Sequence, residues 1–186
     1  MSKKFLTAGN LLRDSFRLAD KIFKDGFRPD FIVGVWRGGA PVAIAIHEFY
    51  EYKGVETDHF SIRTSSYTGI NQQAREVKIY GLKYLLENID ASHSMLIVDD
   101  VFDSGKSIDA LMIEIQKMAG ENIPYDIRIA CPWYKPGNRQ VDLVPDYYLH
   151  ETEEWLVFPH ELQGLTEEEI IQGKSDVADI PQVFKN

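Results

Sequence analysis

The sequence predicts an α/β protein with a mostly parallel central sheet covered by helices on both faces. Short β-rich runs alternate along the chain with segments of helical periodicity. Two of these runs lead through a glycine-containing loop straight into a helix, at 31–52 and again at 93–118. The run that ends in LIV has a continuous apolar end instead of an alternating pattern, which is typical of a parallel strand buried on both faces.

The first half of the chain supports this order element by element. Apolar residues recur at near-helical spacing from Asn10 to Phe23, and Gly26 and Pro29 end that helix. The following segments are predicted in turn as a strand at 31–35, a helix at 40–52, a strand at 55–63, a polar mobile loop at 65–76, a strand at 77–80 and a helix at 81–88.

The second half repeats the alternation. It predicts strands at 93–98, 126–133 and 146–149, a helix at 107–118 and a short helix at 166–172 within an acidic tail of no legible function. Ligands of open parallel sheets bind at the carboxyl ends of the strands. The two glycine loops, at Arg37 and at Gly105, should therefore open on the same edge of the sheet.

The composition of the chain limits the kinds of partner that it can bind. The chain has 186 residues and a net charge of -9, which disfavours nucleic-acid binding because that binding needs clustered Lys and Arg. We expect no membrane span and no signal-peptide core, and therefore a cytoplasmic protein. The single cysteine, Cys131, lies in an apolar run and is expected to be a buried structural thiol.

The stretch LIVDDVFDSGKS carries the most chemistry. It is not a Walker loop, because Asp100 stands where that motif needs its first glycine. Asp99 and Asp100 follow a buried strand and need a polar partner, either a divalent cation or a pair of vicinal hydroxyls. The turn after them, where a helix N-terminus favours phosphate, contains Ser104, Gly105, Lys106 and Ser107. Together they predict a site for a ribose 5-phosphate.

This stretch resembles the phosphoribosyl pyrophosphate motif of the type I phosphoribosyltransferases. Further landmarks of that family follow in order over roughly 10–161. The resemblance implies a phosphoribosyltransferase core at 1–150, followed at 151–186 by a small base-binding hood and the acidic tail. In VGVWRGGAPVA, Arg37, Gly38 and Gly39 match the family's pyrophosphate loop, where a cis peptide can occur; Trp36 departs from its usual small residue.

The resemblance also assigns the polar loop. TSSYTGINQQARE matches the segment that closes over the reaction centre and excludes water, with Ser66 and Tyr67 as the family's Ser-Tyr pair. In PWYKPGNR, Lys135 matches the lysine that donates to the 6-oxo group of a purine, and we expect no nearby acid to compete for it. Without the resemblance, the polar segment would be interpreted as a disordered surface loop and Lys135 as a solvated surface lysine.

The segment DYYLHETEEWLVFPHEL resembles the hood of the 6-oxopurine members. Trp155 matches the aromatic residue that stacks on the base, and Leu156 the residue whose backbone reads the base edge. Glu161 matches an acid that meets Mg²⁺, which would also lie at Asp99 and Asp100. Asp103 matches the acid beside purine nitrogen 7, as an acid/base group or an electrostatic stabiliser; a helix cap is its structural alternative.

The resemblance implies a 6-oxopurine phosphoribosyltransferase of purine salvage, a pentosyltransferase that uses Mg²⁺. Its substrates would be phosphoribosyl pyrophosphate and hypoxanthine, guanine or xanthine, and its state a homo-oligomer. Two alternatives remain open. One is a non-catalytic nucleotide-sensing regulator on the same fold, and the other is a phosphoribosyltransferase for a pyrimidine or another base.

Overall fold

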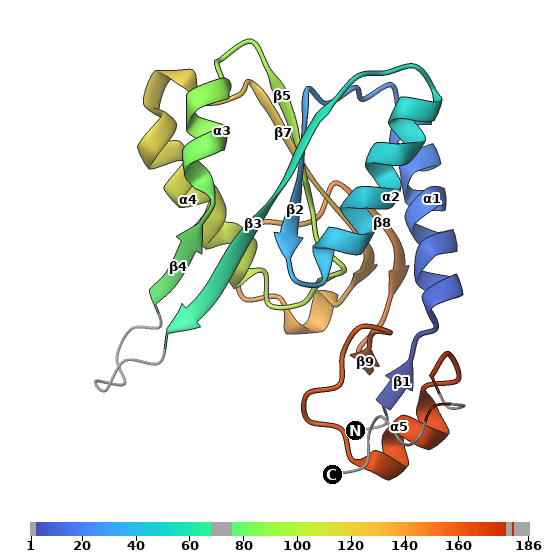
Figure 1. Ribbon diagram of the computed structural model, residues 1–186. Helices are drawn as coiled ribbons and strands as arrows, with labels where there is room; N and C mark the ends of the chain where they lie inside the picture. The colour runs from blue at the N-terminus through green and yellow to red at the C-terminus, as the bar shows by residue number, and fades with distance from the viewer. Residues whose placement is uncertain (1–2, 68–75, 178–179, 181–186) are drawn as a thin grey trace.

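The computed structural model describes residues 3–67, 76–177 and 180 (Figure 1). Its helices are α1 (Ala8–Lys24), α2 (Gly39–Tyr52), α3 (Leu82–Asn88), α4 (Lys106–Ala119) and α5 (Glu167–Gly173). Its strands are β1 (Lys3–Phe5), β2 (Phe31–Trp36), β3 (Asp58–Tyr67), β4 (Glu76–Tyr80), β5 (Ser94–Val98), β6 (Val101–Phe102), β7 (Asp126–Tyr134), β8 (Tyr147–Glu151) and β9 (Trp155–Val157).

The central sheet has seven strands in the order β4-β3-β2-β5-β7-β6, and β8 also pairs with β7. Every pairing in this sheet is parallel except that of β3 with the edge strand β4. The predicted α/β fold with a mostly parallel sheet is therefore confirmed.

Helices cover both faces of the sheet (Figure 1). Because the side chains of a strand alternate between the two faces, each face has its own hydrophobic core. From β2, Ile32 packs with Leu18 of α1 and Val42 of α2 in one core cluster. Its neighbour Val33 packs with Leu85 of α3 and Leu111 of α4 in the other cluster. Both faces are buried, which explains why these strands read as continuous apolar runs.

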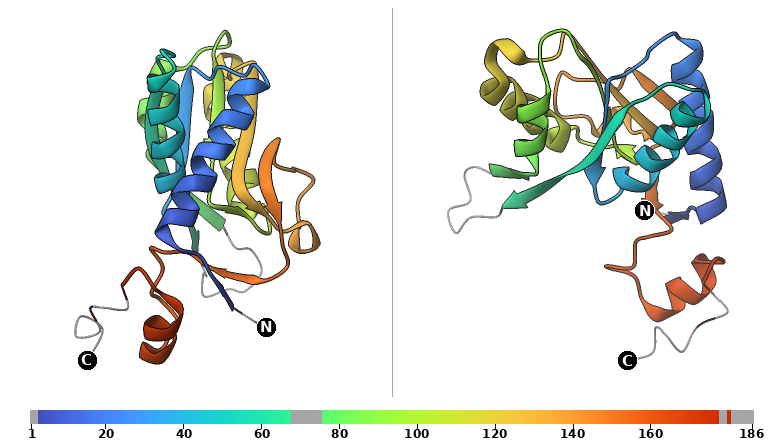
Figure 2. Two further views of the ribbon diagram at one scale, coloured as in Figure 1. Left: turned by 90° about the vertical axis from the view of Figure 1, so that its right-hand side faces the viewer. Right: turned by 45° about the horizontal axis from the view of Figure 1, so that its top comes forward.

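The first strand, β1, and the last helix, α5, lie beyond one end of the sheet, in the hood (Figure 1). In it β1 pairs in parallel with β9, and α5 lies beside them in each view (Figures 1 and 2). Two side-chain contacts from the tail fasten this unit. Glu169 of α5 accepts from the ammonium of Lys3 at 2.6 Å, and Asp176 accepts from the backbone N–H of Ala8 at 2.6 Å.

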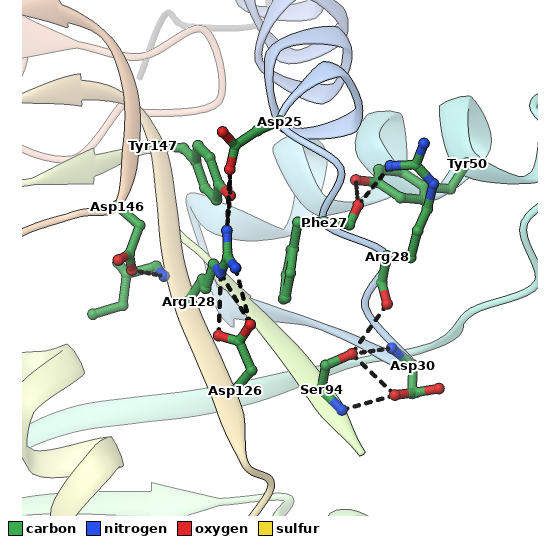
Figure 3. Close-up of polar contacts among 11 residues, drawn as sticks. Asp25, Phe27, Arg28, Asp30, Tyr50, Ser94, Asp126, Arg128, Asp146 and Tyr147 are labelled. Carbon is green, nitrogen blue, oxygen red and sulfur yellow. Dashed lines mark hydrogen bonds and ion pairs between the residues drawn. The ribbon is translucent and has the colours of Figure 1, made fainter. Parts of the chain in front are cut away.

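Near the opposite end of the sheet, a polar network joins α1 to β7 and β8 (Figure 3). The guanidinium of Arg128 donates to both carboxylate oxygens of Asp126, to Asp25 at 3.1 Å and to the Tyr147 hydroxyl. Tyr147 in turn donates to Asp25 at 2.6 Å. These groups satisfy one another's hydrogen-bonding capacity and tie the end of α1 to β7 and β8.

The predicted helices and long strands are present with shifted ends. Residues 65–67, predicted as loop, belong to β3, which begins at Asp58 and not at 55. The sequence reading missed β1, β6 and β9, each of two or three residues. None of the helices in the described part of the chain is long and apolar enough to cross a bilayer. The division at residue 150 stays a prediction.

Candidate active site

The two glycine loops and the residue after β7 open on the end of the sheet that faces the hood, as predicted from the parallel order (Figure 1). β2 ends at Trp36, β5 ends at Val98 and β7 ends at Tyr134. Three adjoining cavities lie around these ends.

The cavities share acidic residues. The smallest, of about 80 Å³, lies at the turn before α4 and includes Asp99, Asp103 and Ser104 in its lining. A second, of about 230 Å³, lies between Arg37 and Asp100. The third, of about 260 Å³, has Trp155 on its wall. Asp99 borders the first two cavities, Asp100 the last two, and Asp103 the first and third. We name them the phosphate, diphosphate and base cavities after the ligand parts that their linings suit.

The phosphate cavity is formed by the turn into α4. Gly105 has a φ of 79°, a left-handed conformation that favours glycine, and α4 begins at Lys106. Ser104, Gly105 and Ser107 line the cavity, so hydroxyls and the free amides of a helix N-terminus surround it. The side chain of Lys106 is exposed and does not line it. The N-cap of α4 is Gly105, and the Lys106 backbone N–H donates to the Ser104 hydroxyl at 3.4 Å, so the structural alternative for Asp103 as a cap is wrong.

Asp99 and Asp100 form a carboxylate pair that suits a cation. Asp99 Oδ1 accepts from the Asp100 backbone N–H at 2.9 Å, and Asp100 is 8% exposed. Burial and the Asp100 carboxylate raise the pKa of Asp99 well above its usual range. Two adjacent carboxylates with this electrostatic cost match Mg²⁺, which takes one or two carboxylates and completes its shell with water and substrate phosphates. In the described residues no cluster of three ligating side chains forms a closed metal cage.

Asp99→Asn should raise the Tm of the protein in EDTA. Because the pKa of Asp99 is raised in the folded state, ionising it destabilises the fold once the pH exceeds its unfolded pKa of about 3.9. The gain in Tm should be largest above the folded-state pKa of Asp99 and vanish near pH 4. Each kcal/mol of added stability should raise the Tm by roughly 2–4 °C. Thermal unfolding from pH 4 to 8 measures it, with the exposed Asp142→Asn as control. A lower Tm than wild type at pH 8 would contradict this account.

The diphosphate cavity lies against the loop after β2. Arg37 and Gly38 line it, and Trp36, 51% exposed, borders it as well. The Trp36–Arg37 peptide is cis. Gly39 lines none of the three cavities, but packs against the end of β5: a Cβ on it would lie 2.3 Å from the Val98 carbonyl oxygen.

The base cavity corrects one expectation. Lys135 has an acid beside it: its Nζ lies 3.2 Å from Asp103 Oδ2, and the residue is 7% exposed. The expectation of no competing acid is wrong because Phe102 pairs with Tyr134 where β6 meets β7, which brings the two following residues together. An ammonium has three donors, so Lys135 can bind Asp103 and still donate to a ligand.

The hood supplies the other wall of the base cavity. Trp155 is 57% exposed, which excludes the reading of it as a core tryptophan, whereas the Leu156 side chain is buried. Glu161 borders both the base and the diphosphate cavities, and its Oε2 accepts from the backbone N–H of Phe158 at 3.0 Å. Lys3 also lines the base cavity, because β1 pairs with β9.

Some site residues differ from the sequence reading. The side chains of Ser66 and Tyr67 and the loop 68–75 lie outside the described residues, so the closing loop stays a prediction. Thr64 and His160 line the diphosphate cavity and were missed. His160 precedes Glu161 in the sequence, and this position next to a predicted metal-binding acid was the signal that could have identified it.

Comparison with known proteins assigns the family. A family model described as a phosphoribosyl transferase domain matches residues 1–163. The chain belongs to the phosphoribosyltransferase family. A purine phosphoribosyltransferase from Pyrococcus horikoshii Ot3 is 31% identical, with a TM-score of 0.71, and the match covers 89% of this chain and 99% of that one. The phosphoribosyltransferase fold predicted from the sequence is thereby confirmed.

Two further solved structures share the fold at lower identity. A xanthine-guanine-hypoxanthine phosphoribosyltransferase from Helicobacter pylori is 22% identical, with a TM-score of 0.64, and covers 84% of this chain and 92% of its own. A hypothetical protein from Neisseria gonorrhoeae with bound ppGpp is 19% identical, with a TM-score of 0.74, and covers 99% and 98%. At these identities the likeness concerns the fold alone.

Proposed function

We propose that this phosphoribosyltransferase transfers the ribosyl 5-phosphate group from phosphoribosyl pyrophosphate to nitrogen 9 of a 6-oxopurine and releases pyrophosphate. The observation that carries the proposal is the set of three adjoining cavities, which share Asp99, Asp100 and Asp103. Each cavity suits one part of the reacting complex: the 5-phosphate, the leaving diphosphate and the base. Each of the three acids borders two of the cavities, which supports a role beside the sugar that would join the three parts.

The contact between Lys135 and Asp103 favours a 6-oxopurine. The oxygen on carbon 6 and nitrogen 7 lie on one edge of such a base. Lys135 Nζ lies 3.2 Å from Asp103 Oδ2. The lysine can therefore donate to the oxygen on carbon 6 while the Asp103 carboxylate accepts the N–H at nitrogen 7. A 6-amino group would instead place a donor against the lysine, which disfavours adenine.

The chain's own groups then carry the reaction through position and charge. The bond from sugar carbon 1 to the diphosphate oxygen breaks, its electron pair leaves with the diphosphate, and nitrogen 9 bonds to carbon 1. Asp103 takes the proton from the purine. Arg37 stabilises the leaving group, and Asp99 and Asp100 stabilise positive charge on the sugar. Mg²⁺, held by Asp99, Asp100 and in part by Glu161, would supply charge neutralisation of the diphosphate.

The test is a spectrophotometric assay of the purified protein with Mg²⁺, phosphoribosyl pyrophosphate and one base at a time: hypoxanthine, guanine, xanthine, adenine or orotate. We expect turnover with at least one of the first three and none with adenine or orotate. Turnover with orotate alone would overturn the proposal in favour of a pyrimidine enzyme.

A nucleotide-sensing regulator is the second candidate. It is favoured by the match to a structure that contains ppGpp and covers 99% of this chain, including its tail. A regulator would bind ppGpp or phosphoribosyl pyrophosphate, measured by calorimetry, and consume no base. The Lys135–Asp103 pair argues against a regulator that binds phosphoribosyl pyrophosphate alone, since that ligand has no base for the lysine to contact. For ppGpp, which carries a guanine, the absence of base turnover is the result that would distinguish a regulator from an enzyme.

Trp155→Ala should mainly weaken purine binding. Stacking on an aromatic ring contributes roughly 1–3 kcal/mol per base, so the KM for the base should rise roughly five- to 150-fold while kcat changes little. Steady-state kinetics with the base varied measures both constants. The control is Tyr52→Ala, which removes an aromatic side chain of α2 that is 85% exposed and should leave both constants unchanged. An unchanged KM, or an equal loss in kcat, would contradict the stacking role.

A further inference from the structure

His160 faces the diphosphate cavity from the hood. It lines this cavity together with Arg37 and Gly38 of the loop after β2. Its Nε2 lies 3.5 Å from Asp100 Oδ2, which is longer than the roughly 2.7–3.2 Å of a good hydrogen bond from nitrogen to oxygen. The side chain is 29% exposed. The imidazole therefore touches the site without a strong partner of its own.

The other histidines show what a structural imidazole does in this fold. The chain has five histidines. His47 bonds a threonine hydroxyl at 2.9 Å, His93 accepts from a backbone N–H at 3.0 Å, and His150 bonds a carboxylate at 2.9 Å. Within the described residues, the ring nitrogens of His160 make no such hydrogen bond, so they are available to a ligand. His59 shares this property, but lies near the start of β3, away from the site.

The turn that presents His160 is held in place. Its ring stacks on Phe158, with an angle of 17° between the planes. The Phe158 carbonyl oxygen accepts from the backbone N–H of Glu161 at 3.0 Å and from the ammonium of Lys174 at 2.7 Å. Lys174 is 5% exposed, and burial lowers its pKa. A donor on such a turn is positioned before the ligand arrives.

The charge of the cavity calls for another donor. Among the described residues that line it, Asp99, Asp100 and Glu161 are acidic, and Arg37 is the one permanent cation. Magnesium held by the acids would neutralise only part of the charge of a diphosphate. An imidazole carries an N–H in either protonation state and can donate to a diphosphate oxygen.

We propose that His160 donates a hydrogen bond to the diphosphate group of phosphoribosyl pyrophosphate and of the released pyrophosphate. The inference rests on the proposed function for the identity of the ligand. It adds a contact from the hood to those of Arg37 and the glycine loop. The hood then binds both the base and the leaving group, and so closes the site from one side.

The test is calorimetric binding of magnesium pyrophosphate to three variants. His160→Phe keeps the stacking on Phe158 and removes the donor, so Kd should rise at least about tenfold, the size of one hydrogen bond to a charged group. His160→Gln keeps an N–H near the position of Nε2 and should stay within about threefold of wild type. His59→Phe is the matched control and should bind as wild type does. His160→Asn, too short to reach, replaces His160→Phe if that variant does not fold.

Kinetics give a second readout. In His160→Phe the KM for phosphoribosyl pyrophosphate should rise while the KM for the base stays unchanged. Equal pyrophosphate affinity in wild type and His160→Phe would overturn the inference, even if bases are converted normally. The two proposals can fail separately. If no base is converted, but His160→Phe alone weakens pyrophosphate binding, the proposed function is refuted and the His160 contact stands.

Discussion

Asp103→Asn should lower kcat by about 10²- to 10⁴-fold, the usual contribution of a positioned acid or base. The amide cannot take the purine proton, and it also leaves the buried ammonium of Lys135 without its charged partner at 3.2 Å. The KM for the base should change much less than kcat, because Trp155 and the cavity walls still hold the ring. Steady-state kinetics with base and phosphoribosyl pyrophosphate varied separately measures the effect.

A second variant separates the two roles of Asp103. If Asp103 acts with Lys135 as a unit, Asp103→Asn combined with Lys135→Met should lose much less than the product of the single losses. Asp142→Asn, in an exposed loop, should behave as wild type. Equal losses in kcat and in base affinity for Asp103→Asn would contradict its assignment to the chemical step.

Gly39→Ala should damage both stability and activity. Its new Cβ would lie 2.3 Å from the Val98 carbonyl oxygen and 2.9 Å from the Asp99 Cα, and neither backbone atom can rotate away. Overpacking of this kind destabilises by about 1–3 kcal/mol or more. Relief of the contact must move the glycine loop or the end of β5, and a displacement of about 1 Å can cost about 10²-fold in rate.

The matched control for this substitution is Gly9→Ala in α1. A Cβ there meets nothing within 4 Å, and the helix should be stabilised by roughly 0.5–1 kcal/mol. Thermal unfolding and kcat/KM for both variants decide the matter. A Gly39→Ala protein with the Tm and kcat/KM of wild type would show that the loop tolerates the extra atom.

Much of the fold could be predicted from local sequence. The helix of α1 is visible in the spacing of its apolar residues, and β5 in its continuous apolar run. The three short strands were not visible, because two or three residues are too few for a strand pattern. β1 is a strand because β9 lies beside it, and the pairing partner is more than 100 residues away.

The residues of the candidate site were also predicted only in part from local sequence. Asp99, Asp100 and Ser104 to Ser107 come from one continuous loop, so the sequence alone could place them together. Lys106 and Gly39 were included with their neighbours, yet the first is exposed and the second packs against β5. Sequence position gives the loop to which a residue belongs, but not the direction of its side chain.

The sequence by itself determined the alternation of strands and helices, the phosphate turn and the resemblance to phosphoribosyltransferases, because these features are local. Only the tertiary structure decided that Lys135 contacts Asp103, that Lys3 reaches the base cavity and that His160 and Arg37 line the same diphosphate cavity. The physical reason is that such contacts join segments that are brought together by strand order and register. These are properties of the packed sheet and its two buried faces, and no single stretch of residues specifies them.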